Sequence, residues 1–191
     1  NTPVQQLRRD PAGAILRLGN GDEKRFDQVV IATHSDQALA MLGDASEAEK
    51  DILGALPYQA NDVVLHTDTR LLPRNRKTWS SWNYRLGVDE SRAVLTYNMN
   101  ILQDINAPET FCVTLNDTDS INPHRILGRF TYDHPVFSLR GMAAQARWDE
   151  INGVNHTWYC GAYWHNGFHE DGVVSALRVA RAMDCEARAA A

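Results

Sequence analysis

Alternation of apolar and polar residues dominates the start of the chain. The stretch VQQLRR alternates from Val4, AILRL alternates again over residues 14–18, and the Gly-Asn-Gly at residues 19–21 is a hairpin signal. Residues 26–33 then run almost entirely apolar through VVIAT, which is typical of a strand buried on both faces in a parallel sheet. The pattern therefore predicts three strands. At the end of the third, the small residues Ala32 and Thr33 allow another group to approach the backbone closely.

Helical spacing of apolar residues follows in two segments. Residues 35–42 are expected to form a short helix, and residues 46–56 a second helix that stops before Pro57. In the second helix, Ser46 is the expected N-cap and Glu49 occupies the reciprocal capping-box position. Its inward-facing stripe would consist of Ile52, Leu53 and Leu56.

The middle of the chain alternates with a period of two. Apparent strands cover residues 62–68, 78–84, 92–98 and 111–115, and turn-rich segments such as RLGVDESR separate them. This pattern predicts an antiparallel sheet with one solvent-exposed face. Residues 121–129 are expected to form a short helix, and residues 129–137 to be extended around Pro135.

The last part of the chain again has the pattern of a buried strand followed by a helix, as in residues 26–42. Residues 157–163 predict another buried strand, and residues 171–183 a helix with Val173, Leu177 and Ala180 on its inner face. Strand composition changes near residues 45 and 137. The predicted fold class is therefore α/β with α+β, in which an α/β layer of residues 1–44 and 138–191 is interrupted by an antiparallel lobe of residues 45–137.

Composition and charge exclude several classes of protein. Apolar residues make up 43% of the 191 residues and charged residues 23%, which fits a folded domain with a substantial core. No apolar run approaches the roughly 18 residues that a membrane-spanning helix requires, so no membrane span is predicted. The net charge of −5 argues against nucleic-acid binding, and we interpret the basic cluster RNRK at residues 74–77 as a solvated loop.

The cysteines and the N-terminus indicate the setting of the protein. Cys112, Cys160 and Cys185 form no CxxC pair, so neither a disulfide framework nor a zinc knuckle is indicated, and a reduced, cytoplasmic location is expected. The opening residues lack the charged start and apolar core of a signal peptide, and they lack an initiating methionine. We therefore expect the chain to be a piece of a longer protein.

A strand, a polar loop and a helix N-terminus follow one another near the end of the chain. The N-terminus of a helix exposes unpaired N–H groups and carries roughly half a positive charge, so it favours an electron-rich partner. Asp171, Gly172 and Val173 would present such amides, and Gly172 would let a flat ligand lie against the backbone. A purely structural alternative is that Asp171 is an N-cap and Gly172 a tight turn.

The combination of three stretches carries a family resemblance. PVQQLRR at residues 3–9, FDQVVIAT at residues 26–33 and YCGAYWHNGFHEDGVVSALRVA at residues 159–180 resemble the FAD-dependent amine oxidase and desaturase superfamily, in particular its bacterial NAD/FAD-binding, flavin-containing amine oxidoreductases. YQANDVVLHTD and WSSWNY extend the resemblance into the middle of the chain. Each fragment is a weak signal alone, and their combination is specific.

The resemblance implies an FAD-dependent oxidoreductase that moves hydride from a small organic substrate to the flavin. The fold would be part of a FAD/NAD(P)-binding Rossmann-like domain, interrupted by an antiparallel-sheet substrate lobe. Amides at the start of the last helix would face flavin N1 and O2, where negative charge accumulates on reduction. The cofactor-binding residues carried over are Val4 for the adenine, Ala32 and Thr33 for the adenosine or pyrophosphate, Gly161 and Ala162 for the ribityl or pyrophosphate, and Asp171, Gly172 and Val173 for the flavin ring.

Two departures from the family pattern limit this interpretation. The strand–GxGxxG–helix unit that holds the pyrophosphate is absent from these residues. Tyr163 stands where the family usually has an acidic residue for the ribityl hydroxyls, and Glu170 or Asp171 would have to replace it. We therefore expect the C-terminal part of a flavoprotein, whose partner is the missing N-terminal part of the same protein, and weak or no FAD binding by this chain alone.

Aromatic residues supply the candidates for substrate binding. Trp164, Trp82 and Tyr84 are the predicted substrate contacts, within a wider set that includes Trp79 and Tyr97 and whose structural alternative is an ordinary core. Asn83 and Asn98 are weaker candidates for orienting a substrate, and satisfied amides are the alternative. The sequence identifies no catalytic residue.

The sequence also contains residues of the types that bind metals. His165, His169 and Glu170 have the ligand types of a metal site, but Gly167 between them disfavours a regular helical face, so no metal is predicted. Amine oxidation and carbon-chain desaturation stay open as reactions. The alternative function is a non-catalytic interaction domain on a flavoprotein scaffold.

Overall fold

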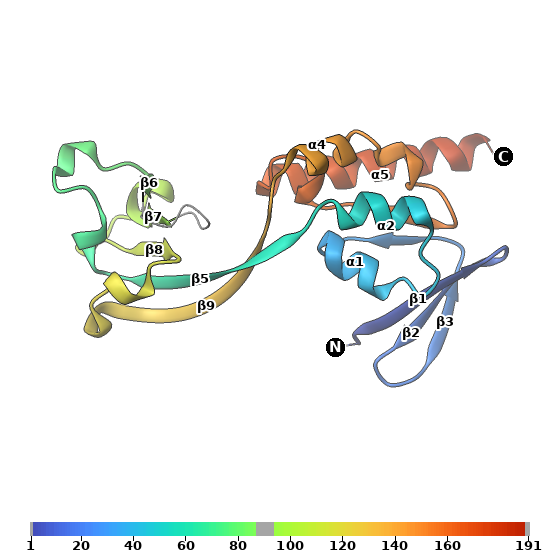
Figure 1. Ribbon diagram of the computed structural model, residues 1–191, viewed down its shortest axis with the longest axis horizontal. Helices are drawn as coiled ribbons and strands as arrows, with labels where there is room; N and C mark the ends of the chain where they lie inside the picture. Colours follow the sequence, from blue (N-terminus) through green and yellow to red (C-terminus); the bar gives the residue numbers. More distant parts are fainter. Residues whose placement is uncertain (1, 87–93, 190–191) are drawn as a thin grey trace. The chain divides into compact units, whose positions relative to one another are not determined.

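The computed structural model describes residues 2–86 and 94–189 and divides the chain into two compact units (Figure 1). Unit 1 comprises Asn1–Gln59 and Pro135–Ala191, and unit 2 comprises Ala60–His134. The expected lobe of residues 45–137 thus differs from unit 2 at its first boundary by some fifteen residues. The assignment of the two units to cofactor and substrate binding stays a prediction.

Unit 1 begins with an antiparallel sheet of three strands in the order β1-β2-β3. The strands are β1 (Val4–Asp10), β2 (Gly13–Leu18) and β3 (Glu23–Phe26), and the Gly-Asn-Gly signal at residues 19–21 lies in the β2–β3 turn. Gly13 is required where β2 starts, because a Cβ there would lie 2.4 Å from the Phe26 carbonyl oxygen. The sheet confirms the predicted hairpin at residues 19–21.

The predicted third strand of residues 26–33 is shorter in the structure, and a strand that the sequence did not predict, β3, precedes it. Antiparallel β3 ends at Phe26, and β4 (Val29–Ile31) then pairs in parallel with β10 (Thr157–Tyr159). The expected parallel strand is thereby confirmed, although it is shorter than the apolar run. All three residues of β10 are buried, whereas Val30 of β4 is exposed, so only β10 is covered on both faces.

The helix α2 (Glu47–Gly54) belongs to unit 1. Its capping box is present as predicted, since the Ser46 hydroxyl accepts from the Glu49 amide at 3.2 Å and the Glu49 carboxylate accepts from the Ser46 amide at 2.8 Å. Ile52 and Leu53 are fully buried in the core of this unit. The sequence placed this helix in the inserted lobe; its apolar stripe instead packs against the α/β layer.

Three further helices complete unit 1: α1 (Ser35–Met41), α4 (Leu139–Gln145) and α5 (His169–Ala189). Short 3₁₀ turns occur at Trp148–Glu150 and Ala162–Trp164. The predicted orientation of α5 is wrong. Ser175 and Val179 are its buried residues, whereas Val173 and Leu177 are 53% and 48% exposed and Ala180 is exposed.

Unit 2 contains most of a five-stranded sheet in the order β6-β7-β8-β5-β9. The strands are β5 (Tyr58–His66), β6 (Trp82–Arg85), β7 (Val94–Asn98), β8 (Cys112–Leu115) and β9 (Ile126–Pro135). The pairs β5–β8, β6–β7 and β7–β8 are antiparallel, as the period-two pattern predicted. The first two residues of the predicted strand 92–98 lie outside the described residues.

Short helical segments connect the strands of unit 2. They are α3 (Met99–Leu102) and 3₁₀ turns at Thr69–Leu71, Arg76–Thr78, Thr118–Ser120 and Pro123–Arg125. The predicted helix at residues 121–129 is wrong beyond its 3₁₀ turn, because β9 starts at Ile126 and continues through the expected extended segment. Among the described residues, no helix combines the length and the apolar character needed to cross a bilayer.

A buried histidine network lies inside the sheet of unit 2. His66 is fully buried; its Nδ1 accepts from the Asp68 amide at 3.0 Å, and its Nε2 lies 2.7 Å from the Thr114 hydroxyl. The Thr114 and Thr96 hydroxyls are 2.8 Å apart. Because Nδ1 accepts, Nε2 carries the proton and donates to Thr114, and burial lowers the pKa of the ring further below its ordinary value.

Candidate functional site

Parallel pairing brings four of the predicted cofactor residues to one edge of unit 1. Ala32 and Thr33 follow β4, and Gly161 and Ala162 follow β10. The hydrogen bonding continues one residue past β10, because the Cys160 amide donates to the carbonyl of Ile31, the last residue of β4, at 3.0 Å. Ligands of α/β proteins bind at the carboxyl ends of parallel strands. Ala32 and Thr33 are exposed there, and Gly161 and Ala162 are half-buried.

Ser175 ties the start of α5 to this edge. Its hydroxyl accepts from the Gly161 amide at 2.8 Å and donates to the Gly172 carbonyl at 2.9 Å. Ser175 is fully buried, so both hydrogen bonds are shielded from water. Sequence reasoning missed this residue. Its only signal is a hydroxyl at a buried position in an otherwise apolar helix face.

The first turn of α5 lies two residues earlier than predicted. The helix starts at His169, and Asp171 therefore occupies its third position. The Asp171 carboxylate accepts from the amides of Phe168 at 2.9 Å and Asn166 at 3.1 Å. Asp171 thus caps the helix from its third position and is not the N-cap that the structural alternative expected.

This shift changes which amides are free at the start of α5. The Gly172 amide already donates to the Phe168 carbonyl at 3.3 Å, and the Val173 amide lies deeper in the helix. Among the described residues, the amides with no intrahelical acceptor are those of His169, Glu170 and Asp171. Of the predicted set Asp171, Gly172 and Val173, only Asp171 belongs to this group.

The surface beside Gly172 is open. A Cβ built on this residue would meet no other atom within 4 Å, apart from its own helix and neighbours. Gly172 therefore does not serve a tight turn, and no packing against the chain requires it. Its lack of a side chain leaves room at the start of α5, next to the edge formed by β4 and β10.

Tyr163 is part of the core rather than of this open edge. It is 1% exposed, and a Cβ on Gly161 would lie 2.4 Å from its ring, so the ring fills the space over that glycine. Its hydroxyl is buried and has no hydrogen-bond partner among the described residues. Burial, with smaller effects of Cys160 and Tyr58, raises the pKa of Tyr163 far above its ordinary value. Its hydroxyl is therefore not placed to replace an acidic ligand at the surface.

An aromatic cluster continues from Tyr163. His34 stacks on Tyr58 with 4.0 Å between ring centroids, Tyr58 meets Tyr163 edge-on at 6.5 Å, and Tyr163 contacts Trp164 at 5.3 Å. Trp164 is only 4% exposed, so in unit 1 it is a core residue. Its predicted role as a substrate contact stays untested, and its burial disfavours that role.

The other predicted substrate residues lie on β6 in unit 2. Trp82 and Tyr84 are 47% and 63% exposed, and Trp82 packs edge-on against Tyr97 at 5.3 Å. Asn83 is satisfied structurally, since its amide donates to the carbonyls of Ser80 at 2.7 Å and Thr96 at 3.1 Å. Trp82 and Tyr84 are accordingly the predicted substrate residues with solvent-exposed aromatic side chains.

Val4 lies apart from the parallel pair. It is the first residue of β1 and pairs with Leu18 in the antiparallel sheet, where the register shifts between Val4 and Gln6. The region after α1 meets this sheet farther along, where the Gly43 amide donates to the Leu7 carbonyl at 2.8 Å. The role of Val4 toward an adenine stays a prediction.

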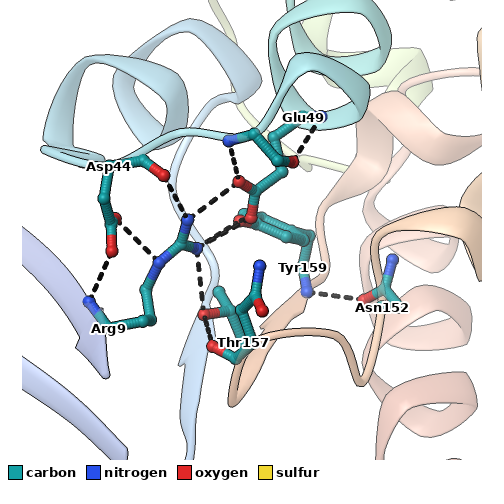
Figure 2. Close-up of polar contacts among 8 residues, drawn as sticks. Arg9, Asp44, Glu49, Asn152, Thr157 and Tyr159 are labelled. Carbon is teal, nitrogen blue, oxygen red and sulfur yellow. Dashed lines mark hydrogen bonds and ion pairs between the residues drawn. The ribbon is translucent and has the colours of Figure 1, made fainter. Parts of the chain in front are cut away.

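A buried ionic network contacts Thr157 and Tyr159 of β10 (Figure 2). The Arg9 guanidinium of β1 pairs with Glu49 of α2 at 2.7 Å and with Asp44 at 2.8 Å, and also reaches the Thr157 hydroxyl at 3.2 Å. The Tyr159 hydroxyl donates to Glu49 at 2.6 Å. One carboxylate thus links β1, α2 and β10.

The charges of this network are strongly stabilised. Burial alone would raise the pKa of Glu49, but hydrogen bonds from Arg9, Tyr159 and the Ser46 amide outweigh it and lower the pKa to about 2. Burial and the adjacent Glu49 carboxylate raise the pKa of Tyr159 well above its ordinary value, so Tyr159 stays a donor. The network is structural, and it fixes the strand that ends at the candidate edge.

Other surface features of the described residues do not add to this site. A cavity of about 490 Å³ in unit 2 is lined by residues of β5, β9 and the segment after β8, including Asp62, Asp117, Asp119 and Arg129. One of about 340 Å³ in unit 1 lies near Arg9, Asp44 and His156, at the opposite end of β10 from Gly161. No group of three or more His, Cys, Asp or Glu side chains within the described ranges could hold a metal ion.

The sequence matches no protein-family model and no curated protein sequence at a significant level. Solved structures, in contrast, share its fold. A CLA-producing fatty acid isomerase from P. acnes is similar with a TM-score of 0.61 and 14% identity, covering 94% of this chain and 47% of that chain. Cyclohexylamine oxidase from Brevibacterium oxydans IH-35A gives a TM-score of 0.61 at 14% identity, covering 97% and 48%.

Putrescine oxidase bound to putrescine has the same relation to this chain. The TM-score is 0.60 at 10% identity, and the match covers 97% of this chain and 49% of that chain. The chain therefore spans about half the length of the solved structures it matches. At these identities the comparison shows a shared fold, in which both units of this chain are included.

Proposed function

We propose that this chain supplies the C-terminal half of an FAD-dependent oxidoreductase of the amine-oxidase type. The observation that carries the proposal is the joined edge of unit 1, where the ends of β4 and β10 and the start of α5 are held together by Ser175. Three stretches of sequence resemble that superfamily. Two of the solved structures named above are amine oxidases, which supports the same class.

The residues at this edge fit a flat, electron-rich cofactor. Exposed Ala32 and Thr33 offer backbone without bulky side chains, and Gly172 leaves open space beside the helix start. The positive end of the α5 dipole and the free amides of His169, Glu170 and Asp171 favour negative charge there. FAD, when bound, would supply the chemistry by accepting hydride from the substrate.

In this proposal the chain would position FAD and stabilise the negative charge that develops on the flavin ring. Val4, Ala32, Thr33, Gly161 and Ala162 would line the nucleotide and ribityl portions of FAD, and the first turn of α5, including Asp171, Gly172 and Val173, would face the flavin ring. The amides are preorganised before charge develops, because Ser175 and Asp171 fix the helix start. The missing strand–GxGxxG–helix would come from the N-terminal part of the same protein.

Unit 2 would then bind the substrate. Its exposed aromatic residues Trp82 and Tyr84 are the proposed contacts, with Trp164 of unit 1 as a buried support rather than a direct one. The substrate would be a small organic molecule, and oxidation of an amine is the reaction we propose. The match to a fatty acid isomerase is the reason to test carbon-chain substrates beside amines.

A second candidate function is a non-catalytic interaction domain on the same scaffold. The observation that favours it is that a tyrosine, Tyr163, stands where the family usually has an acidic residue for the ribityl hydroxyls, and that its own hydroxyl is buried. Glu170 at the start of α5 is exposed and is the remaining acidic candidate, because Asp171 is already used in capping.

A visible absorption spectrum of the full-length protein distinguishes the two functions. An oxidoreductase would purify with stoichiometric flavin, and its absorbance would bleach without oxygen when a substrate amine is added. The 191-residue chain alone is expected to retain little or no flavin, because it lacks the pyrophosphate-binding unit. A folded, colourless full-length protein that takes up no FAD would rule out the enzyme and favour the interaction domain.

A further inference from the structure

The helix α5 is apolar on two opposite faces. Ser175 and Val179 are buried against unit 1, with Ala182 and Met183 packed beside them. Val173, Leu177 and Ala180 are spaced by four and three residues, which places them together on the opposite side of the helix. We call these three residues the outer stripe. A helix that is apolar on both sides is usually enclosed between two layers of structure.

The outer stripe is exposed in this chain. Val173 and Leu177 expose about half of their surface, and Val174 beside them is exposed as well. Charged residues bound the stripe, with Glu170 before it and Arg181 and Asp184 after it. Its length is about 11 Å at 1.5 Å per residue, which corresponds to two helical turns.

The parallel sheet of unit 1 is also smaller than such sheets usually are. Among the described residues, β4 and β10 form a parallel sheet of two strands. Parallel sheets are normally larger and are covered by helices on both faces. The chain covers 47–49% of the three solved structures it matches, so their fold contains about as much chain again. The exposed apolar helix and the small sheet both point to that absent half.

We propose that the outer stripe of α5 is the surface on which the N-terminal half of the same polypeptide packs, through an apolar face of the unit that carries the GxGxxG turn. This inference rests on the proposed function for the identity of the partner. A preceding segment is tethered to the chain, so its effective concentration is high and a small apolar contact suffices.

A second copy of the chain fits this surface less well. A stable dimer buries about 800 Å² on each partner, and three small or medium side chains over two turns supply only a fraction of that area. In a symmetric contact the same surface of both copies would meet, so the charged residues around the stripe would have to be complementary to those of the second copy. Self-association through the outer stripe is therefore the alternative that the labelling experiment distinguishes.

Cysteine labelling of the outer stripe tests the inference. In a Cys185→Ser background, Leu177→Cys is compared with Ala12→Cys in the exposed β1–β2 turn, and the two remaining cysteines, Cys112 and Cys160, are buried. Maleimide labelling rates are measured in the 191-residue chain and in the full-length polypeptide from its own initiating methionine. Val173→Cys serves as a second reporter if Leu177→Cys fails to fold.

We expect Leu177→Cys to label as fast as Ala12→Cys in the 191-residue chain and at least tenfold more slowly in the full-length polypeptide, with Ala12→Cys unchanged. Equal labelling in both polypeptides, or a native polypeptide that starts at Asn1, would overturn the inference. Protection in the 191-residue chain that grows with its concentration would overturn it in favour of a second copy. Protection without flavin would uphold the interface and reject only the proposed function.

Discussion

Among single residues of unit 1, Glu49 connects three elements of structure through its carboxylate. Its carboxylate accepts from Arg9, from Tyr159 and from the Ser46 amide, so it both caps α2 and anchors the strand that leads to Gly161. A buried carboxylate is costly unless it is paired, and here every partner is a donor. Loss of the carboxylate charge would leave Arg9 with Asp44 as its remaining acidic partner.

Glu49→Gln is expected to destabilise the protein by about 3 kcal/mol, the usual cost of removing one partner of a buried ion pair. The matched control is Glu47→Gln on the exposed side of the same helix, whose carboxylate pairs only with Lys50 and should cost less than about 0.5 kcal/mol. Urea unfolding at pH 7 measures both. A Glu49→Gln variant as stable as the control would contradict the structural role of the network.

The same carboxylate gives a pH dependence with a definite sign. Its pKa falls from an ordinary 4.5 to about 2 on folding, so the unfolded chain binds the proton first as pH decreases. The stabilisation is complete above pH 4.5 and is lost as pH falls toward 2. In that window the stability of Glu49→Gln should change less with pH than that of the wild type.

At the scale of elements, the sheet of unit 2 contains a buried, neutral histidine, His66, at the end of β5. His66 accepts from the Asp68 amide and donates toward Thr114, and protonation of Nδ1 would remove the first of these hydrogen bonds. Burial lowers its folded pKa below the ordinary 6.5. The unfolded chain therefore takes up the proton first when pH falls below that value.

Stability of unit 2 is accordingly expected to decrease as pH is lowered from 7 to 5, by up to about 1.4 kcal/mol for each unit by which the pKa is depressed. His66→Gln should lose this dependence, whereas the exposed control His124→Gln should keep it. Thermal unfolding followed by circular dichroism across this pH range is the measurement. An unchanged pH profile in His66→Gln would show that another group is responsible.

The elements that sequence could predict are those with local signals. The capping box at Ser46 and Glu49, the Gly-Asn-Gly hairpin and the alternating strands of unit 2 were all readable, because each depends on neighbouring residues. The inner face of α5 was not, since its outer stripe is as regular as a core stripe and only tertiary packing selects between them. The strand β3 was not predicted, because its sequence EKRF is charged and precedes the apolar run of residues 26–33.

The candidate site shows the same limit. Ala32, Thr33, Gly161 and Ala162 were identified from their places after apolar strands, and parallel pairing brings them to one edge. Ser175 and the Arg9–Glu49–Tyr159 network could not be predicted, because their partners are distant in sequence. The free amides at the start of α5 were misplaced by two residues, since Asp171 caps the helix from its third position.

At the scale of the whole molecule, a shared fold and one open edge of unit 1 support the proposed function. The chain matches about half of several solved enzymes, and its two units correspond to parts of that fold. We propose that the space beside Gly172 holds the flavin. Since no atom of the described chain fills that space, the glycine has no packing reason to be there.

Flavin content of the full-length Gly172→Leu variant tests this claim most directly. Leucine favours helix over glycine by about 0.8 kcal/mol, so the thermal midpoint should stay the same or rise, as in the control Ala40→Leu at an exposed position of α1. We expect at least a tenfold loss of bound FAD in Gly172→Leu and none in Ala40→Leu. Full flavin occupancy in a folded Gly172→Leu protein would contradict it.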